Sequence, residues 1–238
     1  MPQKDFDGKN FDRQAAAARV ANLLLDIGAV NFDAEKPFIF TSGWASPVYI
    51  DCRRVISFLP ERREIISLGC DLLRATCDVN AIDYIAGGET AGISYAAWIS
   101  EALDKPMLYV RKKPKGFGRG AQIEGHMREG AKVLLVEDLA TDGASKVAFG
   151  NALREAGAVV NDVFSVFFYG IYRESPQIFS DAKLNLHALA TWKDVLTEAR
   201  ARHLFPAAVF NEVEKFLNAP AEWSRDHGGA FERLKTAG

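Results

Sequence analysis

The sequence predicts an α/β protein in which helices cover both faces of a parallel β-sheet. Between residues 84 and 168, short apolar runs alternate with helical patterns, as expected of crossover units that link parallel strands. The chain has 238 residues, of which 48% are hydrophobic, and its net charge is −2. A chain of this length buries about 70% of the surface that its unfolded form exposes, so its core requires neither a metal nor a disulfide.

The elements are predicted from the spacing of apolar residues. Helices are expected from Arg13 to Ile27 and from Glu61 to Ala75, with two short extended pieces between Pro37 and Asp51. The alternating region contains four expected strands and two expected helices. The strands are Tyr84–Ala86, Met107–Val110, Val133–Val136 and Val159–Phe168, and the helices are Ala91–Leu103 and Ala144–Ala156. An apolar run and two helices separated by Pro206 follow, and the chain after Pro220 is expected to be loosely held.

Composition argues against several classes of protein. The near-zero net charge is unlike that of a dedicated nucleic-acid binder, and the apolar stretches are shorter than the roughly 18 residues of a membrane helix. Residues 1–11 lack the apolar region of a secretion signal, so a cytoplasmic location is expected. The cysteines form no Cys-x-x-Cys pair and the histidines no His-x-x-x-His pair, which predicts neither a disulfide framework nor structural zinc.

Residues 133–146 are the most informative segment. They comprise an apolar strand, the acidic pair Glu137–Asp138, a loop of small residues and the start of a helix. Ligands of open parallel sheets bind beyond the carboxyl ends of the strands. Carboxylates there accept hydrogen bonds from ribose hydroxyls, and Thr141, Gly143 and Ser145 offer hydroxyls and backbone N–H groups to a phosphate at the helix N-terminus. The segment therefore predicts a ribose 5-phosphate site.

The same residues also have a purely structural interpretation. In that interpretation the acidic pair ends a strand and Thr141–Ser145 caps a helix. The Gly-x-x-x-x-Gly-Lys pattern of a Walker loop is missing, and the glycines of residues 116–120 have the wrong spacing for a dinucleotide turn. The motif by itself leaves both interpretations open.

This segment resembles the phosphoribosyl-diphosphate (PRPP) signature of the type I phosphoribosyltransferases. The resemblance implies that family's parallel-sheet fold with an N-terminal substrate hood, here with extra C-terminal helices. It also implies that the acidic pair binds the ribose hydroxyls and that the loop surrounds the 5-phosphate. The implied PRPP-binding residues are Glu137, Asp138, Leu139, Ala140, Thr141, Asp142, Gly143, Ala144 and Ser145.

The resemblance covers roughly Arg13 to Tyr169, and no motif in the remainder matches the family. Because no repeat or linker divides the chain, residues 1–238 are expected to form a single phosphoribosyltransferase domain. Within it, residues 1–60 form an N-terminal helix and hood, residues 61–170 the core, and residues 171–238 a C-terminal helical extension.

Two further segments narrow the resemblance to the orotate phosphoribosyltransferase family. Residues 40–51 resemble that family's Ser-Gly-x-x-Ser-Pro-x-Tyr segment beside the orotate ring, which makes Tyr49 and Ile50, together with Thr141, the implied orotate-binding residues. Residues 85–92 are similar to the turn that receives the diphosphate. The implied diphosphate loop is Gly88, Glu89 and Thr90, where glycine lets the backbone approach an anion closely.

Residues 111–125 resemble the mobile catalytic lid of these enzymes. Five positive residues lie within the nine positions from 111 to 119, and a solvated charge run is the structural alternative. The resemblance implies that Arg111, Lys112 and Lys115 bind PRPP and that both lysines are catalytic. It also implies a homodimer in which the lid loop 111–125 completes the neighbouring subunit's site.

The implied reaction displaces diphosphate from C1 of PRPP by N1 of orotate and gives orotidine 5′-monophosphate, a step of pyrimidine (UMP) biosynthesis. Mg²⁺ is the implied cofactor, and the diphosphate carries it, so no direct metal site is expected on the chain. Lid charges and Mg²⁺ would neutralise the leaving group, while Asp138, the third implied catalytic residue, orients the ribose. The implied partners are PRPP, orotate and a second copy of the chain, with neither nucleic acid nor membrane.

The sequence departs from the family's pattern at several positions. Phe117 replaces a lid histidine, and Arg119 is our hypothesis for the charge that replaces it. Thr41 and Ala91 stand where some members carry lysines, which shifts anion binding towards the lid.

Three alternatives stay open at this stage. A phosphoribosyltransferase for another base would share the acidic pair and the phosphate loop, and only residues 42–51 argue for orotate. A regulatory protein that binds PRPP without catalysis is favoured by Phe117 alone. A sugar-phosphate enzyme of unrelated chemistry would leave the basic segment unexplained.

Overall fold

The computed structural model describes residues 11–40, 42–115 and 122–231. Within these ranges the central sheet has six strands in the order β10-β9-β8-β5-β6-β7. Neighbouring strands are parallel except β7, which runs antiparallel to β6. The strands are β5 (Tyr84–Gly88), β6 (Met107–Val110), β7 (Ile123–Glu124), β8 (Lys132–Ala140), β9 (Val159–Phe168) and β10 (Asn185–Thr191). The predicted α/β class with a parallel sheet is confirmed.

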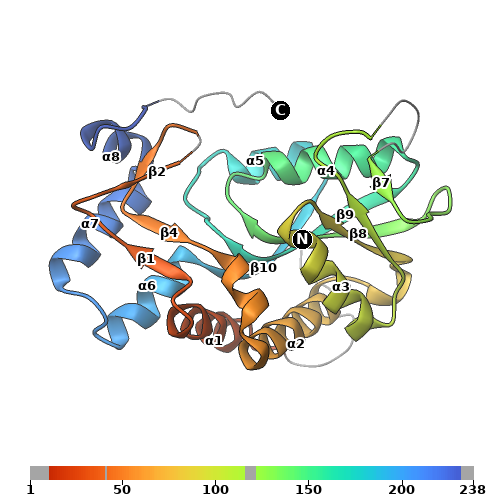
Figure 1. Ribbon diagram of the computed structural model, residues 1–238, viewed down its shortest axis with the longest axis horizontal. Coiled ribbons are helices and arrows are strands. Elements are labelled where there is room, and N and C mark those ends of the chain that lie inside the picture. Colours follow the sequence, from red (N-terminus) through yellow and green to blue (C-terminus); the bar gives the residue numbers. More distant parts are fainter. Residues whose placement is uncertain (1–10, 41, 116–121, 232–238) are drawn as a thin grey trace.

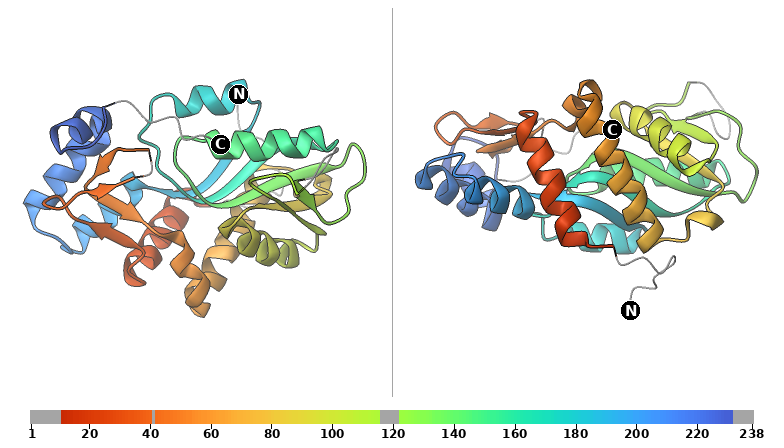
Figure 2. Two further views of the ribbon diagram at one scale, coloured as in Figure 1. Left: turned by 45° about the horizontal axis from the view of Figure 1, so that its top comes forward. Right: turned by 90° about the horizontal axis from the view of Figure 1, so that it is seen from below.

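Helices cover both faces of this sheet (Figures 1 and 2). One face carries α1 (Arg13–Asp26), α2 (Leu59–Thr76) and α3 (Ala91–Leu103), and the other carries α4 (Ala144–Glu155) and α5 (Ser175–Asp181). Side chains alternate along β8, so that Leu134 and Val136 join the first core while Val133 and Leu135 join the second. Each face of the sheet is therefore buried against helices. In the described part of the chain, no helix is long and apolar enough to cross a membrane.

The helices begin where the local sequence favours it. Asp12 caps α1 by accepting a hydrogen bond from the backbone N–H of Ala15 (2.9 Å), and Val20 and Leu24 of this helix are fully buried. Helix α2 begins two residues before the expected Glu61, because Pro60 fits the first turn of a helix. Strand β8 continues to Ala140, so the acidic pair lies within the end of the strand rather than after it.

The hood lies beside the carboxyl edge of the sheet and consists of two small antiparallel pairs. Strand β1 (Val30–Phe32) pairs with β4 (Val48–Ile50), and β2 (Phe38–Ile39) pairs with β3 (Ala45–Ser46). The 3₁₀ helix η1 (Cys52–Ser57) connects the hood to α2, and η2 (Val79–Ala81) precedes β5.

Residues 171–238 differ from the expected helical extension. Strand β10 joins the central sheet beside β9, so the core takes one of its strands from this part of the chain. The helices α6 (Trp192–Ala201) and α7 (Ala207–Asn218) follow. Helix α6 lies against α1, where Asn22 donates to Glu198 (2.6 Å) and Arg202 pairs with Asp26 (2.7 Å). The boundary between core and C-terminal extension that the sequence suggested at residue 170 therefore falls within the core, because β10 lies beyond it.

The expectation of a loosely held chain after Pro220 is wrong for residues 220–231. Helix α8 (Pro220–Asp226) packs against the hood (Figure 1). The backbone N–H of Ala45 in β3 donates to the Ser224 hydroxyl (2.9 Å), and Ala230 N–H donates to the carbonyl of Gly43 (2.8 Å). The C-terminal helices thus help to form the hood.

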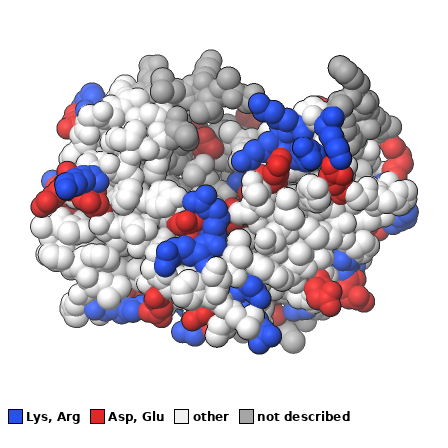
Figure 3. All heavy atoms as spheres, viewed as in Figure 1, with Lys and Arg blue, Asp and Glu red and all other residues white. Residues whose placement is uncertain are grey.

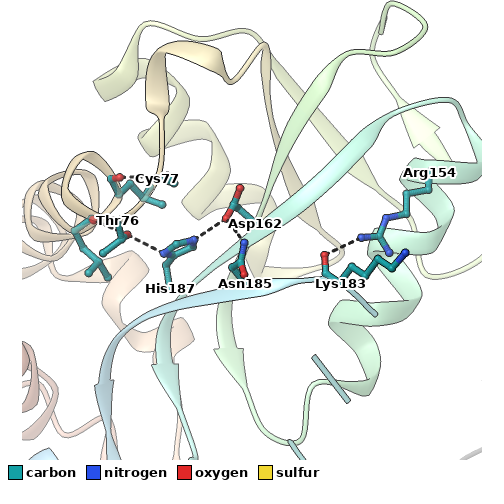
Figure 4. Close-up of polar contacts among 9 residues, drawn as sticks. Thr76, Cys77, Arg154, Asp162, Lys183, Asn185 and His187 are labelled. Atoms are coloured by element: carbon teal, nitrogen blue, oxygen red, sulfur yellow. Dashed lines mark hydrogen bonds and ion pairs between the residues drawn. The ribbon is translucent and has the colours of Figure 1, made fainter. Parts of the chain in front are cut away.

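A polar cluster lies near the amino ends of β9 and β10 (Figure 4). His187 Nε2 lies 2.9 Å from Asp162 Oδ1, and His187 Nδ1 lies 2.7 Å from the Thr76 hydroxyl at the end of α2. Asn185 also donates to Asp162 (3.1 Å). Burial would raise the pKa of Asp162, but the hydrogen bonds from His187 and Asn185 outweigh it and lower this pKa. The cluster therefore stabilises the ends of the strands opposite the candidate site.

Candidate active site

The predicted site segments meet at the carboxyl ends of β5, β6 and β8. Gly88 lies beside Val110 in the sheet, and Gly87 lies beside Val136. The two strands that flank β5 therefore end next to its last residue. The backbone N–H of Lys112, after β6, donates to Glu89 Oε2 (2.7 Å), and Glu89 N–H donates to the Val110 carbonyl (2.9 Å). These bonds hold the turn after β5 against the start of the lid.

The acidic pair points to opposite faces of the sheet. Successive side chains of a strand alternate, so Glu137 lies on the α4 side and Asp138 on the hood side. Glu137 forms a buried ion pair with Lys146 of α4, with Oε2 and Nζ 3.2 Å apart. The charge of Asp138 interacts with that of Arg53 in η1. The pair thus links α4 to the hood.

Both carboxyl groups are less acidic than usual. Burial raises the pKa of Glu137 to about 7, although the Lys146 ammonium acts in the opposite direction. Burial also raises the pKa of Asp138, against the charge of Lys146 and backbone hydrogen bonds. Perturbed carboxyl groups at a strand end are typical of functional sites.

The loop from Thr141 to Ser145 leads from β8 into α4. Gly143 has a φ of 102°, a left-handed conformation that favours glycine, and a Cβ there would lie 2.8 Å from the Phe179 ring. Gly143, the N-cap residue of α4, has no side chain to bond the first turn, and Ala144 and Ser145 are exposed. Ala144 N–H donates to Asp142 Oδ1 (3.0 Å). Leu139 is partly buried against the core and Ala140 is fully buried, so Ala140 can contact a ligand only through its backbone.

Gly88, at the start of the turn after β5, has no room for a side chain. A Cβ at Gly88 would lie 1.7 Å from Glu137 Oε1 and 2.7 Å from the ring of Phe149. The space above this glycine therefore holds the Glu137 carboxylate. Thr90, at the tip of the turn, is exposed.

The described parts of the lid, residues 111–115 and 122–125, form two facing stems. Arg111 N–H donates to the Gln122 carbonyl (2.8 Å), and Gln122 donates from its side chain to the Arg111 carbonyl (2.9 Å). Glu124 lies 3.5 Å from Arg111 and 3.8 Å from Lys115, whose side chain is 72% exposed. Figure 3 shows Lys and Arg side chains gathered over the segment that follows β6. Phe117 and Arg119 lie outside the described residues.

The hood contributes Tyr49, whose ring lies 5.6 Å from that of Phe38. Ile50 is only 2% exposed, so its side chain packs in the core and any contact with a ligand would have to come from its backbone. Arg53 donates to the Tyr49 hydroxyl (3.0 Å) and to Asp51 (2.6 Å). Thr41 lies outside the described residues.

Two residues of this site were missed from the sequence. Arg53 lies two positions after the predicted hood segment. It could have been found from the sequence as a charged residue three positions after Ile50, which was assigned to the base. Lys146 stands three and seven positions before Phe149 and Leu153, which are buried in α4. A lysine on the apolar face of a helix was the signal there.

Comparison with known proteins identifies relatives over nearly the whole chain. No family model matches the chain. An orotate phosphoribosyltransferase of Rhizobium rhizogenes is 47% identical over 221 residues, which are 93% of this chain and 95% of that protein.

Solved structures share the fold. The orotate phosphoribosyltransferase of Aeropyrum pernix has a TM-score of 0.63 at 29% identity, over 79% of this chain and 99% of that one. The UMP synthase of Leishmania donovani has a TM-score of 0.73 at 25% identity, over 86% of this chain and 42% of that one. The chain shares this fold, and a relative that is 47% identical to it matches nearly the full length of both proteins. The chain therefore belongs to the orotate phosphoribosyltransferase family.

Proposed function

We propose that this protein transfers the 5-phosphoribosyl group of PRPP to orotate, giving orotidine 5′-monophosphate and diphosphate. The observation that carries the proposal is the convergence of the acidic pair, the loop before α4, the turn after β5 and the basic stems at one edge of the sheet. Each of these segments offers the chemistry that one part of PRPP requires. The similarity to orotate phosphoribosyltransferases over 93% of the chain supports the same activity.

The ribose and its 5-phosphate are assigned to β8 and the loop that follows. Asp138 and Glu137 accept hydrogen bonds from the ribose hydroxyls, and residues 139–145 surround the phosphate. The N-terminus of α4 supports this assignment, because its dipole and its exposed first turn favour an anion, although Asp142 already accepts from the first N–H of the helix, that of Ala144. Asp138 is the catalytic member of the pair, since it holds the ribose in place while positive charge develops at C1.

The diphosphate is assigned to Gly88, Glu89 and Thr90, with Arg111, Lys112 and Lys115 supplying positive charge as the bond to C1 breaks. Lys112 and Lys115 are the catalytic lysines in this proposal. A diphosphate carries Mg²⁺ through its own oxygens, and the exposed turn and the nearby basic stems fit such a complex without a dedicated protein metal site. When bound, Mg²⁺ would neutralise charge on the leaving group.

Orotate is assigned to the space between the hood and Asp138. Tyr49, the backbone of Ile50 and Thr141 border it, and Arg53 adds a positive charge beside Tyr49. N1 of orotate attacks C1 as the bond from C1 to diphosphate breaks, and the proton of N1 leaves to the departing diphosphate or to water, so no dedicated general base on the chain is required. A closed lid excludes water, which would otherwise hydrolyse PRPP.

A homodimer is part of the proposal, with the lid loop 111–125 of one subunit completing the site of the other. The exposure of Lys115 on the described stem supports this arrangement, because its ammonium is held only by the long 3.8 Å contact with Glu124 among the described residues and is accessible to another chain. Mixing Lys115→Ala subunits with Asp138→Asn subunits tests it. Recovery of activity in the mixed dimer is expected, since one of its two sites combines an intact lid with an intact Asp138. No recovery in a mixture shown to exchange subunits would contradict the shared site.

The activity is tested by incubating the protein with Mg²⁺, PRPP and orotate while following orotate absorbance and diphosphate release. Uracil and hypoxanthine are run in parallel. We expect turnover with orotate alone. Turnover with another base would overturn the assignment of the hood residues, and PRPP binding without any turnover would indicate a regulatory protein.

A further inference from the structure

Lys146 is a buried lysine on the apolar face of α4. Its side chain is 7% exposed, and its ammonium lies 3.2 Å from Glu137 Oε2 and 3.2 Å from the Ser145 hydroxyl. Lysines are almost never fully buried unless they are paired. Phe149 and Leu153 on the same helix face belong to the core, so helix packing alone would place an apolar residue at position 146. The lysine therefore requires an explanation from its charge.

Glu137 is held on two sides. Lys146 contacts Oε2, while Oε1 is buried above Gly88 and, among the described residues, has no hydrogen-bond partner. A buried carboxylate oxygen without a donor has lost its bonds to water and gained none in return, which destabilises the ionised group. Among the described residues, Lys146 thus supplies the hydrogen bond and the opposite charge of the Glu137 carboxylate, while packing above Gly88 holds its other oxygen.

Three charged groups act on Glu137. Lys146 acts from α4, Asp138 from β8 and Lys112 from the segment after β6. Burial raises the pKa of Glu137 most strongly, Asp138 raises it further, and the two lysines lower it. Lys146 also lowers the pKa of Asp138. It is therefore the cation common to both carboxyl groups.

We propose that Lys146 is a positioning residue of the ribose site, whose ammonium holds Glu137 in place and balances the charge of the Glu137–Asp138 pair so that both carboxyl groups can ionise when PRPP binds. This inference rests on the proposed function, because it concerns the ribose of PRPP. PRPP is a polyanion, so two uncompensated carboxylates at its ribose would repel it. A cation fixed behind the pair keeps both hydrogen-bond acceptors while reducing that repulsion.

The binding test compares the pH dependence of PRPP affinity in wild-type protein and in Lys146→Met, by calorimetry with Mg²⁺ present. In the variant the carboxyl groups ionise only at higher pH. We therefore expect the rise in affinity with pH to move upward by about 1–3 units, the effect of removing one opposite charge at this distance. Lys215→Met is the matched control, because Lys215 forms an exposed ion pair with Glu212 (2.7 Å) and lies in α7. Its profile should equal that of the wild type.

A stability test needs no PRPP. A carboxyl group whose pKa is higher in the folded protein than in the unfolded chain costs stability as the pH rises. The Tm of Lys146→Met should therefore fall progressively below that of the wild type as the pH increases. The double variant Lys146→Met with Glu137→Gln should lose most of this pH dependence, because Glu137 no longer ionises.

The outcomes separate the two proposals. If wild-type protein does not bind PRPP, the proposed function is wrong. If the wild type binds PRPP but Lys146→Met keeps its pH profile, or if the Tm deficit is the same at every pH, then Lys146 acts through packing alone and the positioning role is wrong.

Discussion

Arg53 lies where the hood meets the carboxyl edge of the sheet. Its guanidinium is anchored by Asp51 and donates to Tyr49, while its side chain remains 58% exposed. An anchored but exposed arginine suits a bidentate bond to a carboxylate, the group that distinguishes orotate from uracil. Arg53 is therefore the residue expected to govern the choice of base.

We expect Arg53→Gln to raise the KM for orotate about 10-fold or more, since a hydrogen bond to a charged group contributes about 1.5–3 kcal/mol. PRPP affinity should change much less. Steady-state kinetics with each substrate varied in turn measures both effects. Arg54→Gln serves as the control, because Arg54 donates to the Ile27 carbonyl and lies 5.9 Å from the Phe58 ring. Equal effects of the two variants would contradict the assignment.

Lys115 carries a charge that is weakly held in this structure. Its ammonium is 3.8 Å from Glu124, a carboxylate shared with Arg111. A lysine that meets the diphosphate mainly in the transition state contributes to kcat rather than to ground-state binding. The role of Lys115 can therefore be read from whether its substitution changes kcat or KM.

We expect Lys115→Ala to lower kcat by about 10-fold or more, the loss of roughly 1.4 kcal/mol of transition-state stabilisation. Lys113→Ala removes an exposed lysine two positions earlier and should have little effect. An increase in KM with an unchanged kcat would show that the lid only clamps the substrate.

At the scale of elements, β9 and β10 are stabilised at their amino ends by Asp162, His187 and Thr76. The pKa of Asp162 is lowered, because two hydrogen bonds outweigh burial. A carboxyl group with a lowered pKa in the folded state stabilises the protein above its unfolded pKa of about 4, and this contribution is lost as the pH falls through the folded value.

Asp162→Asn should therefore reduce the free energy of unfolding at neutral pH by about 1.5–3 kcal/mol, and by less at strongly acidic pH. Urea unfolding at about pH 7 and pH 3 measures the difference. Asp181→Asn, at an exposed carboxylate that accepts from Gln177, is the control. A deficit that does not shrink in acid would mean that the charge of Asp162 is irrelevant to stability.

At the scale of the whole molecule, the hood is built from both ends of the chain. Residues 30–50 form its strands, and α8 covers β3 through the buried Ser224. The segments that we assign to PRPP lie instead at the carboxyl edge of the central sheet. The two substrates are therefore expected to depend on different parts of the molecule.

Deleting residues 220–238 should lower the Tm and raise the KM for orotate, with a smaller change in PRPP affinity, because the deletion removes the support of β3. Thermal unfolding and substrate kinetics provide the comparison. Removal of residues 232–238 alone is the control, so that the effect of residues 220–231 is measured as the difference between the two deletions. A larger loss of PRPP affinity than of orotate affinity would contradict this division.

The sequence by itself determined the α/β class, most of the central strands and helices, and the placing of the acidic pair and the small-residue loop between β8 and α4. These features are local: a strand, a loop and the first turn of a helix lie within residues 133–146, and their apolar spacing and small residues follow directly from the chain. Helix α3 and strands β6 and β9 have the expected bounds for the same reason.

Only the tertiary structure decided the features that join distant residues. It placed β10 in the sheet, brought Ser224 to Ala45 across 179 positions, and paired Lys146 with Glu137 inside the site. Periodicity reports which face of an element is buried but not what buries it, so neither the hood's C-terminal support nor the partner of a buried lysine could be predicted. The contact that a distant segment makes is set by the packing of the whole chain, which no local pattern records.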